Sequence, residues 1–169
     1  MMRSWAVFDS PIQEGLHTLK YRRNIGLGES IAIQMVDFVS SLDWPVEVLM
    51  PVPLGKNRLK ERGYNQVGLV ARPLAFQLGL RYEPNALRKI RETRSQVGLS
   101  VSERRNNVQN AYQADPKVVK GKSILMMDDV ATTGSTISAC TEALHLAGAQ
   151  AVYVITIARA LSHHSLNRV

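Results

Sequence analysis

The segment of residues 124–136 constrains this chain more than any other part of its sequence. Its first four residues are apolar, which is typical of a strand buried on both faces of a parallel sheet. Asp128 and Asp129 follow at the expected end of that strand, and a turn of small residues leads into a helical pattern that ends at Gly148. Ligands of open α/β sheets bind beyond the carboxyl ends of the strands, so this segment predicts a binding site.

The turn at residues 131–136 is suited to a phosphate group. Small residues allow successive backbone N–H groups to converge, and the positive end of the following helix adds to their field. Asp128 and Asp129 would repel an isolated phosphate. They would accept hydrogen bonds from the hydroxyl groups of a sugar phosphate, and they can hold Mg²⁺ directly or through water. A ribose 5-phosphate combines these groups in the required order.

Other interpretations of the segment lead to different functions. It could be a helix N-terminus in which the acids have no functional role. A receiver-type acidic pocket is a weaker alternative, because its acids should come from different strands. A Walker-type phosphate loop is excluded, because the chain contains no Gly-x-x-x-x-Gly-Lys-Ser/Thr sequence.

The whole segment resembles the phosphoribosyl-pyrophosphate (PRPP) motif of type I phosphoribosyltransferases. The apolar strand, the Asp-Asp pair and the Thr-Thr-Gly-Ser-Thr loop all match. The resemblance implies that PRPP is the substrate and that Asp128 and Asp129 are catalytic residues, which bind the ribose hydroxyls and Mg²⁺. It also implies that the 5-phosphate binds at Val130, Ala131, Thr132, Thr133, Gly134, Ser135 and Thr136.

Further pieces of the chain resemble the ComF family of competence-associated, phosphoribosyltransferase-like proteins. With the PRPP motif they cover roughly residues 46–158 in the order of that family, and a short N-terminal piece fits as well. The pieces are Leu19-Lys20-Tyr21, Pro51-Val52-Pro53-Leu54, Arg62-Gly63-Tyr64-Asn65-Gln66, Thr93 with Gln96, and Glu103-Arg104 with Asn107-Val108.

Two departures from the relatives limit what the resemblance implies. Many relatives carry a cysteine-rich zinc module, which the single Cys140 cannot build, so we expect no zinc and transfer no DNA contact of that module. Purine-salvage relatives have an aspartate where this chain has Thr132, so a purine acceptor is disfavoured. The acceptor is therefore left open.

Two basic segments account for the whole net charge of +7. Residues 56–62 contribute +3 and residues 88–105 contribute +4. They predict a polyanionic partner, either pyrophosphate or nucleic acid, unless they form only a solvated basic face. Pro53 and Leu54, in the turn before the first segment, and Lys56 within it are expected on the pyrophosphate side of the binding site. Arg58 and Arg62 are expected to be catalytic residues that neutralise the leaving group.

The second basic segment includes a polar and poorly periodic region, which predicts a mobile flap that closes over the site. A plain surface loop is the alternative interpretation. The expected flap residues are Arg91, Thr93, Arg94, Gln96, Arg104 and Asn107.

The order of strands and helices predicts an α/β fold with a doubly wound, mainly parallel sheet flanked by helices. Helices are expected from residue 10 to about 22, at 28–42 and from residue 64, and Pro73 should kink or split the last of these. Buried strands are expected at 46–50, 124–127 and 151–157, and a strand pair at 80–82 and 87–90. A helical turn at 102–107 and a short strand at 111–112 complete the prediction.

Length and composition favour one domain at 1–169, with its core at about 46–158 and an N-terminal helical extension at 10–42. No apolar run is long enough to span a membrane, and the N-terminus does not resemble a secretion signal. With one cysteine, a cytoplasmic location is the expectation. A homo-oligomer is possible.

Two functions follow from these features. The first is an enzyme that transfers 5-phosphoribosyl from PRPP to an unidentified acceptor with release of pyrophosphate. The second is a non-catalytic accessory protein of DNA uptake and natural transformation, which binds single-stranded DNA and uses the site for a nucleotide or phosphate. Aromatic residues that stack on bases beside the basic segments would support the second, and only Tyr64, Tyr82 and Tyr112 are nearby.

Overall fold

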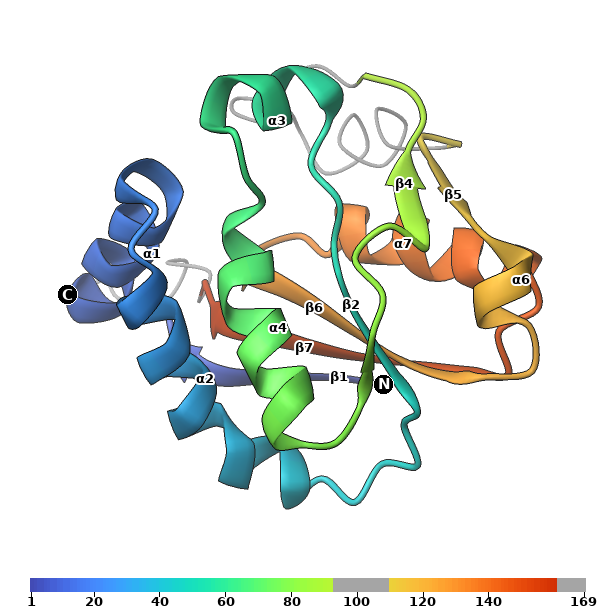
Figure 1. The fold of residues 1–169 in the computed structure, drawn as a ribbon, viewed down its shortest axis with the longest axis horizontal. Helices are drawn as coiled ribbons and strands as arrows, with labels where there is room; N and C mark the ends of the chain where they lie inside the picture. Colours follow the sequence, from blue (N-terminus) through green and yellow to red (C-terminus); the bar gives the residue numbers. More distant parts are fainter. Residues whose placement is uncertain (93–109, 161–169) are drawn as a thin grey trace, which may run out of the picture.

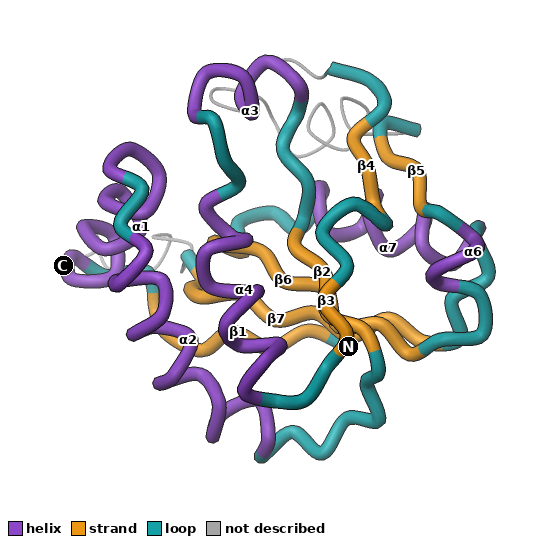
Figure 2. Tube along the Cα trace, in the orientation of Figure 1, coloured by secondary structure: helices purple, strands orange, loops and turns teal. Residues whose placement is uncertain are grey.

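The computed structural model describes residues 1–92 and 110–160. Among these residues, one parallel sheet of five strands forms the centre, in the order β1-β7-β6-β2-β3. Figure 1 shows helices on both sides of this sheet, and Figure 2 shows the strands as the central layer. The elements are β1 (Met2–Val7), α1 (Ser10–Arg22), α2 (Ile25–Ser40), β2 (Val48–Pro51), α3 (Lys56–Arg62), α4 (Gln66–Gln77), β3 (Arg81–Tyr82), β4 (Leu87–Lys89), β5 (Tyr112–Ala114), α6 (Pro116–Val119), β6 (Ser123–Ala131), α7 (Ser135–Leu146) and β7 (Ala151–Arg159).

The core strand β6 lies between β2 and β7 and is parallel to both. Side chains alternate between the faces of a strand, so its apolar run serves two hydrophobic clusters. Ile124 and Met126 belong to one cluster, and Leu125 and Met127 belong to the other. All four side chains are fully buried, which confirms the predicted strand with two buried faces.

The two faces of the sheet are covered by different elements. Helices α1, α2 and α4 pack on the face of Leu125, where they contribute Leu19, Met35 and Leu74 to the core. Helix α7 and the two-stranded sheet of β4 and β5 pack on the face of Ile124. The doubly wound, mainly parallel fold is therefore confirmed (Figure 1).

Strand pairing near residues 80–90 differs from the prediction. Strand β3 does not pair with β4 but extends the main sheet beside β2, where Leu49 and Tyr82 are partners. Strand β4 pairs antiparallel with β5 in a separate sheet. Strands β3 and β4 are so short that their sequences do not indicate which strand each one pairs with. The N-terminal strand β1, which pairs with β7, was not predicted.

Helix boundaries also differ in detail from the prediction. Asp9 caps α1 by accepting a hydrogen bond from the backbone N–H of Ile12. Asn24 caps α2 in the same way, so this helix begins before residue 28. Pro73 lies within the single helix α4 and does not split it. No helix among the described residues is long and apolar enough to cross a membrane.

Candidate active site

The predicted site residues lie at the carboxyl edge of the parallel sheet. The end of β2 pairs with β6 through Pro51 and Met127, and the backbone N–H of Val52 donates to the carbonyl of Met127 at 2.8 Å. The turn after β2 and the turn after β6 therefore begin side by side. This juxtaposition is what the parallel arrangement of the two strands predicts.

The turn after β6 presents backbone donors at the start of α7. Gly134 has a φ of 74°, a left-handed conformation that a residue with a side chain rarely adopts, and it precedes the first residue of the helix. Within the described part of the chain, the backbone N–H groups of Thr132, Thr133, Gly134 and Ser135 donate to no acceptor. The Thr133 and Ser135 hydroxyls lie 3.1 Å apart. The turn is thus able to receive an anion.

Asp129 is held by three hydrogen-bonding partners. Its Oδ2 accepts from Lys20 Nζ at 2.9 Å and from Gln66 Nε2 at 3.1 Å, and its Oδ1 accepts from the backbone N–H of Val130 at 2.8 Å. Burial on its own would raise the pKa of Asp129, but the charge and hydrogen bonds of Lys20 outweigh it and hold this pKa below its ordinary value. Asp129 is therefore an ionised carboxylate at neutral pH.

Asp128 is the more weakly acidic member of the pair. Burial, and then the neighbouring charge of Asp129, raise the pKa of Asp128 to about 7. The Asp128 Oδ1 accepts from the backbone N–H of Asp129 at 2.9 Å, which partly offsets both effects. The two adjacent acids thus have different affinities for a proton, with Asp128 the one that titrates near neutrality.

Strands β4 and β5 bring further polar side chains to the neighbourhood of the turn after β6. Tyr112 hydrogen-bonds to Thr136 of the turn, and burial followed by the charges of Cys140 and Asp128 raises the pKa of Tyr112. Lys89 Nζ lies 5.9 Å from the centroid of the Tyr112 ring. Burial, and then the charge of Arg58, lower the pKa of Lys89, with Glu92 acting against them. These contacts connect the β4–β5 sheet to the turn at residues 131–136, which is called the phosphate turn below.

The turn after β2 carries the residues expected on the pyrophosphate side. Pro53 and Leu54 are half-buried there, and Lys56 and Arg58 are exposed on α3. The carboxylate of Glu92 rests on this turn and accepts from the backbone N–H of Asn57 at 3.2 Å. An acidic group of the chain therefore lies where an anionic leaving group was predicted.

The remaining predicted residues are placed as follows. Arg62 donates to Gln66 Oε1 at 2.9 Å and lies over the ring of Tyr21, so it supports the partner of Asp129. Arg91 is exposed beside Glu92. The other five expected flap residues lie outside the described residues, and they are Thr93, Arg94, Gln96, Arg104 and Asn107. The helical turn predicted at 102–107 also lies outside the described residues.

Sequence reasoning assigned no role to Lys20 or Gln66, and it did not place Lys89 or Tyr112 at this site. Lys20 and Gln66 fall in pieces of sequence that resemble the ComF family, which was the available signal for them. The residues next to Lys20 and Gln66 in the sequence do not indicate that either side chain contacts Asp129. Lys89 and Tyr112 lie in short strands, and only their pairing brings them to the site.

The two aspartates are the residues that fit a metal ion. No cluster of three or more His, Cys, Asp or Glu side chains able to hold a metal occurs in the parts of the chain that the structure describes. Mg²⁺ in phosphate sites commonly uses one or two protein carboxylates and takes its other ligands from water and substrate. Asp128 and Asp129 match this donor set.

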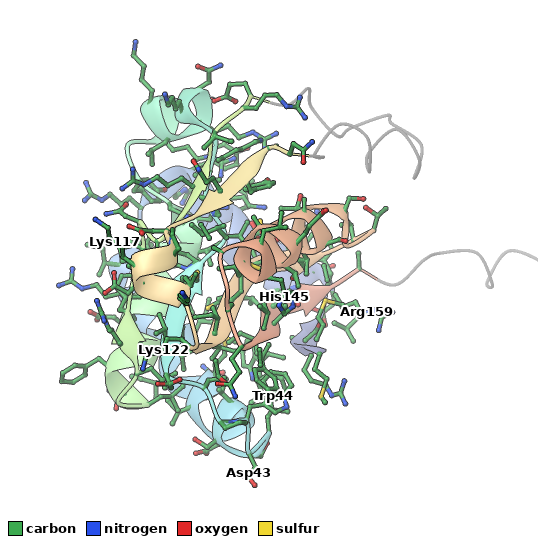
Figure 3. All side chains as sticks on the ribbon, turned by 90° about the vertical axis from the view of Figure 1, so that its right-hand side faces the viewer. Asp43, Trp44, Lys117, Lys122, His145 and Arg159 are labelled. Atoms are coloured by element: carbon green, nitrogen blue, oxygen red, sulfur yellow. The ribbon has the colours of Figure 1, made fainter. Side chains whose placement is uncertain are left out.

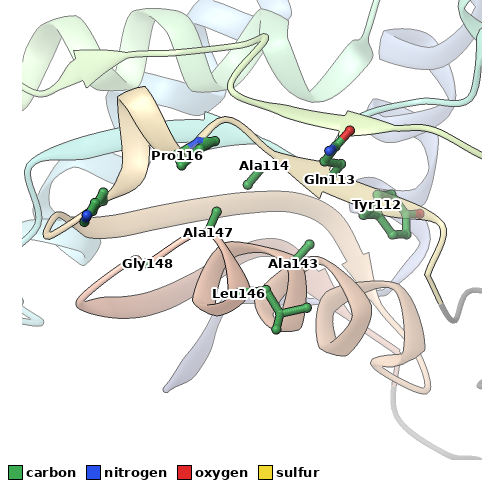
Figure 4. A pocket seen from close by; sticks show the side chains of 9 residues that line it. Tyr112, Gln113, Ala114, Pro116, Ala143, Leu146, Ala147 and Gly148 are labelled. Carbon is green, nitrogen blue, oxygen red and sulfur yellow. The ribbon is translucent and has the colours of Figure 1, made fainter.

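A separate cavity of about 570 Å³ lies between β5, α6 and α7, as Figure 4 shows. It contains neither aspartate and no residue of the phosphate turn, so it is distinct from the predicted site. Its lining residues are Tyr112, Gln113, Ala114, Pro116, Lys120, Ala143, Leu146, Ala147 and Gly148.

Solved structures with a similar backbone are phosphoribosyltransferases. An allosteric regulatory enzyme of purine biosynthesis matches with a TM-score of 0.51 and 23% identity, over 78% of this chain and 26% of that chain. An adenine phosphoribosyltransferase matches with a TM-score of 0.50 and 17% identity, over 83% of this chain and 73% of that chain. At these identities the similarity shows the type I phosphoribosyltransferase fold.

Sequence relatives identify the family. The sequence model of the phosphoribosyl transferase domain matches residues 63–167. DNA utilization protein YhgH of Salmonella typhimurium is 31% identical over 160 residues, which cover 91% of this chain and 70% of that protein. Competence protein ComFC of Bacillus subtilis is 30% identical over 143 residues, which cover 80% of this chain and 54% of that protein. The chain therefore belongs to the ComF family of phosphoribosyltransferase-like proteins.

Proposed function

We propose that this protein binds PRPP with Mg²⁺ and transfers its 5-phosphoribosyl group to an acceptor, releasing pyrophosphate. One observation carries the proposal. An acidic pair near the end of β6 is followed, after Val130 and Ala131, by a turn whose N–H groups, from Thr132 to Ser135, are available to an anion at the start of α7. This arrangement suits a ligand with a phosphate at one end and hydroxyl groups beside it.

The site residues would divide the ligand between them. The 5-phosphate would bind at residues 131–136, and the ribose hydroxyls would donate to Asp128 and Asp129. Mg²⁺, held by the same two acids directly or through water, would supply positive charge to the pyrophosphate oxygens. Thr132 stands where purine-salvage relatives have an aspartate, so the acceptor is unlike a purine base.

Catalysis would depend on positioning and electrostatics, with no nucleophilic side chain required. Loss of pyrophosphate from C1 leaves positive charge on the sugar, close to the acidic pair, and negative charge on the leaving group. Arg58 and Lys56 on α3 would neutralise the leaving group. Glu92 has to leave the turn after β2 before a pyrophosphate oxygen can reach the N–H of Asn57.

A binding measurement tests the proposal. We expect titration calorimetry to show that PRPP binds the wild-type protein when Mg²⁺ is present, and that Asp128→Asn combined with Asp129→Asn abolishes this binding. Asp43→Asn is the matched control, because Asp43 is exposed at the opposite edge of the sheet, before β2 (Figure 3). Absence of PRPP binding by the wild-type protein would refute the proposal. Pyrophosphate release across a panel of acceptors would then identify the second substrate.

A second candidate is an accessory role in DNA uptake, in line with the names of the relatives. A cationic and aromatic surface favours it. Tyr21 is 62% exposed and Arg62 lies 5.4 Å from its ring centroid, while Arg23 lies 5.7 Å from that of Tyr64. Of the three tyrosines near the basic segments, Tyr112 is only 9% exposed, so its ring offers little surface to a base.

The same double variant distinguishes the two functions. Asn at residues 128 and 129 should leave the affinity for single-stranded DNA unchanged or higher, because it removes negative charge near the basic surface. Neutralising Arg91, Arg94, Arg104 and Arg105 should flatten the salt dependence of DNA binding. A salt titration that detects no DNA binding near physiological ionic strength would rule out the second candidate.

A further inference from the structure

The N-terminal helix α1 reaches the acidic pair through one side chain. Lys20, in the last turn of α1, places its ammonium group 2.9 Å from Asp129 Oδ2. The two side chains are 28% and 15% exposed, so the ion pair is largely shielded from water. Pairs of this kind are stronger than exposed surface pairs, because screening is weaker there.

The geometry around Asp129 leaves a defined place for a ligand. An ionised carboxylate offers about four lone-pair sites, two on each oxygen. Lys20 and Gln66 take both sites on Oδ2, and the N–H of Val130 takes one on Oδ1. One site on Oδ1 is left for a ligand hydroxyl, and its direction is set by the partners that hold Oδ2.

The end of α1 is fixed to the elements that carry the other partner. The hydroxyl of Tyr64 donates to the carbonyl of Leu19 at 2.7 Å and accepts from the backbone N–H of Arg23 at 2.9 Å. Arg62 donates to the same Gln66 side chain that bonds Asp129. Lys20 is therefore presented to Asp129 by an anchored helix end.

We propose that Lys20 is a positioning residue of this site, which holds the Asp129 carboxylate correctly directed for a ribose hydroxyl, so that helix α1 is an integral part of the active site. The inference rests on the proposed function. It assigns a role in ligand binding to a segment that sequence reasoning treated as an extension outside the core. Lys20 acts through Asp129, and contact with the pyrophosphate is not required.

A comparison of ligands with and without hydroxyl groups distinguishes this positioning role of Lys20 from a general role in stabilising the fold. Ribose 5-phosphate has hydroxyl groups for Asp129, whereas inorganic pyrophosphate has none. In calorimetric titrations with Mg²⁺, we expect Lys20→Met to weaken binding of PRPP and ribose 5-phosphate about tenfold, the loss typical of one charge-assisted hydrogen bond. Binding of pyrophosphate, titrated without Mg²⁺ so that Asp129 has no metal ion to hold, should be unchanged. Lys20→Arg should recover most of the lost affinity, because it restores a cationic donor.

Lys117→Met is the matched control, since Lys117 is exposed on α6 (Figure 3), which precedes β6 in the chain. Thermal unfolding of each variant shows whether the fold is retained. Equal weakening for pyrophosphate and for ribose 5-phosphate would overturn the inference, and so would unchanged PRPP affinity in Lys20→Met. If the wild-type protein binds no PRPP, the proposed function itself fails, a result that is distinct from either of these.

Discussion

Asp128 and Asp129 are chemically identical neighbours that the fold makes different. Lys20, Gln66 and the N–H of Val130 stabilise the charge on Asp129, whereas burial and the charge of Asp129 disfavour the charge on Asp128. A pair with one fixed negative charge and one group that titrates near neutrality can adjust its total charge to a cationic or neutral ligand. This asymmetry belongs to the folded chain, because both aspartates have the same ordinary pKa of about 3.9.

Asp128→Asn should stabilise the metal-free protein in a pH-dependent way. The pKa of Asp128 is about 7 in the folded state, above its ordinary value, so ionisation of Asp128 costs folding free energy. This cost is absent below about pH 4, grows between pH 4 and 7, and is complete above pH 7. We expect the asparagine variant to be more stable than wild type by roughly 2–4 kcal/mol at pH 8 and by much less at pH 5.

Urea denaturation in the presence of a chelator measures this difference at each pH. Asp43→Asn provides the comparison for an exposed acid outside the site. A gain in stability that is the same at pH 5 and pH 8 would show that Asp128 does not titrate in this range.

Contact between α2 and α4 depends on a glycine and a proline. Pro73 cannot donate a hydrogen bond to the carbonyl of Leu69, four residues earlier in α4. Gly28 of α2 packs against this carbonyl so closely that a Cβ atom at Gly28 would lie 2.7 Å from the Leu69 oxygen. The absence of a side chain therefore sets the distance between the two helices on this face of the sheet.

Gly28→Ala should destabilise the protein, because the added methyl group meets backbone atoms that cannot move without shifting a helix. We expect a loss of about 1–3 kcal/mol in the free energy of unfolding, measured by chemical denaturation. Gly26→Ala lies in the same helix, where the nearest atom to an added Cβ is the Asn24 side-chain oxygen at 3.7 Å. This control should be neutral or slightly stabilising, and equal losses in both variants would refute the packing argument.

Long elements were more predictable than short ones, for a physical reason. Strand β6 and helix α7 carry apolar patterns that reflect burial, and both lie where the sequence indicated, although β6 continues through the acidic pair to Ala131 instead of ending at residue 127. Strands β3 and β4 are two and three residues long, and their pairing depends on which neighbouring strand edge is exposed. Local sequence carries no information about that edge, so the predicted pairing of these two strands was wrong.

The molecule as a whole is organised around β6, which has a hydrogen-bonded strand on each side and core side chains on both faces. The outer strands β1 and β3 each have one strand neighbour. Since β6 also carries the acidic pair near its carboxyl end, a strand with core side chains on both faces carries the residues expected to bind the ligand. Rigid support of this kind favours precise placement of the two carboxylates.

Hydrogen exchange should reveal this organisation. We expect the backbone amides of residues 124–127 to exchange slowly, at rates set by global unfolding, and those of β3 to exchange faster through local opening. Exchange followed by mass spectrometry or NMR would measure both. Similar protection of the two strands would contradict the description of β6 as the central element.

The sequence by itself determined the strand with two buried faces, the acidic pair, the phosphate turn and the helix that follows, because each depends on residues adjacent in the chain. It also indicated the parallel sheet and the family. Only the tertiary structure decided that Lys20 and Gln66 hold Asp129, that Tyr112 hydrogen-bonds to Thr136, and that Glu92 rests on the turn after β2. These contacts join residues far apart in sequence, and their formation depends on how the helices and the second sheet pack against the edge of the first.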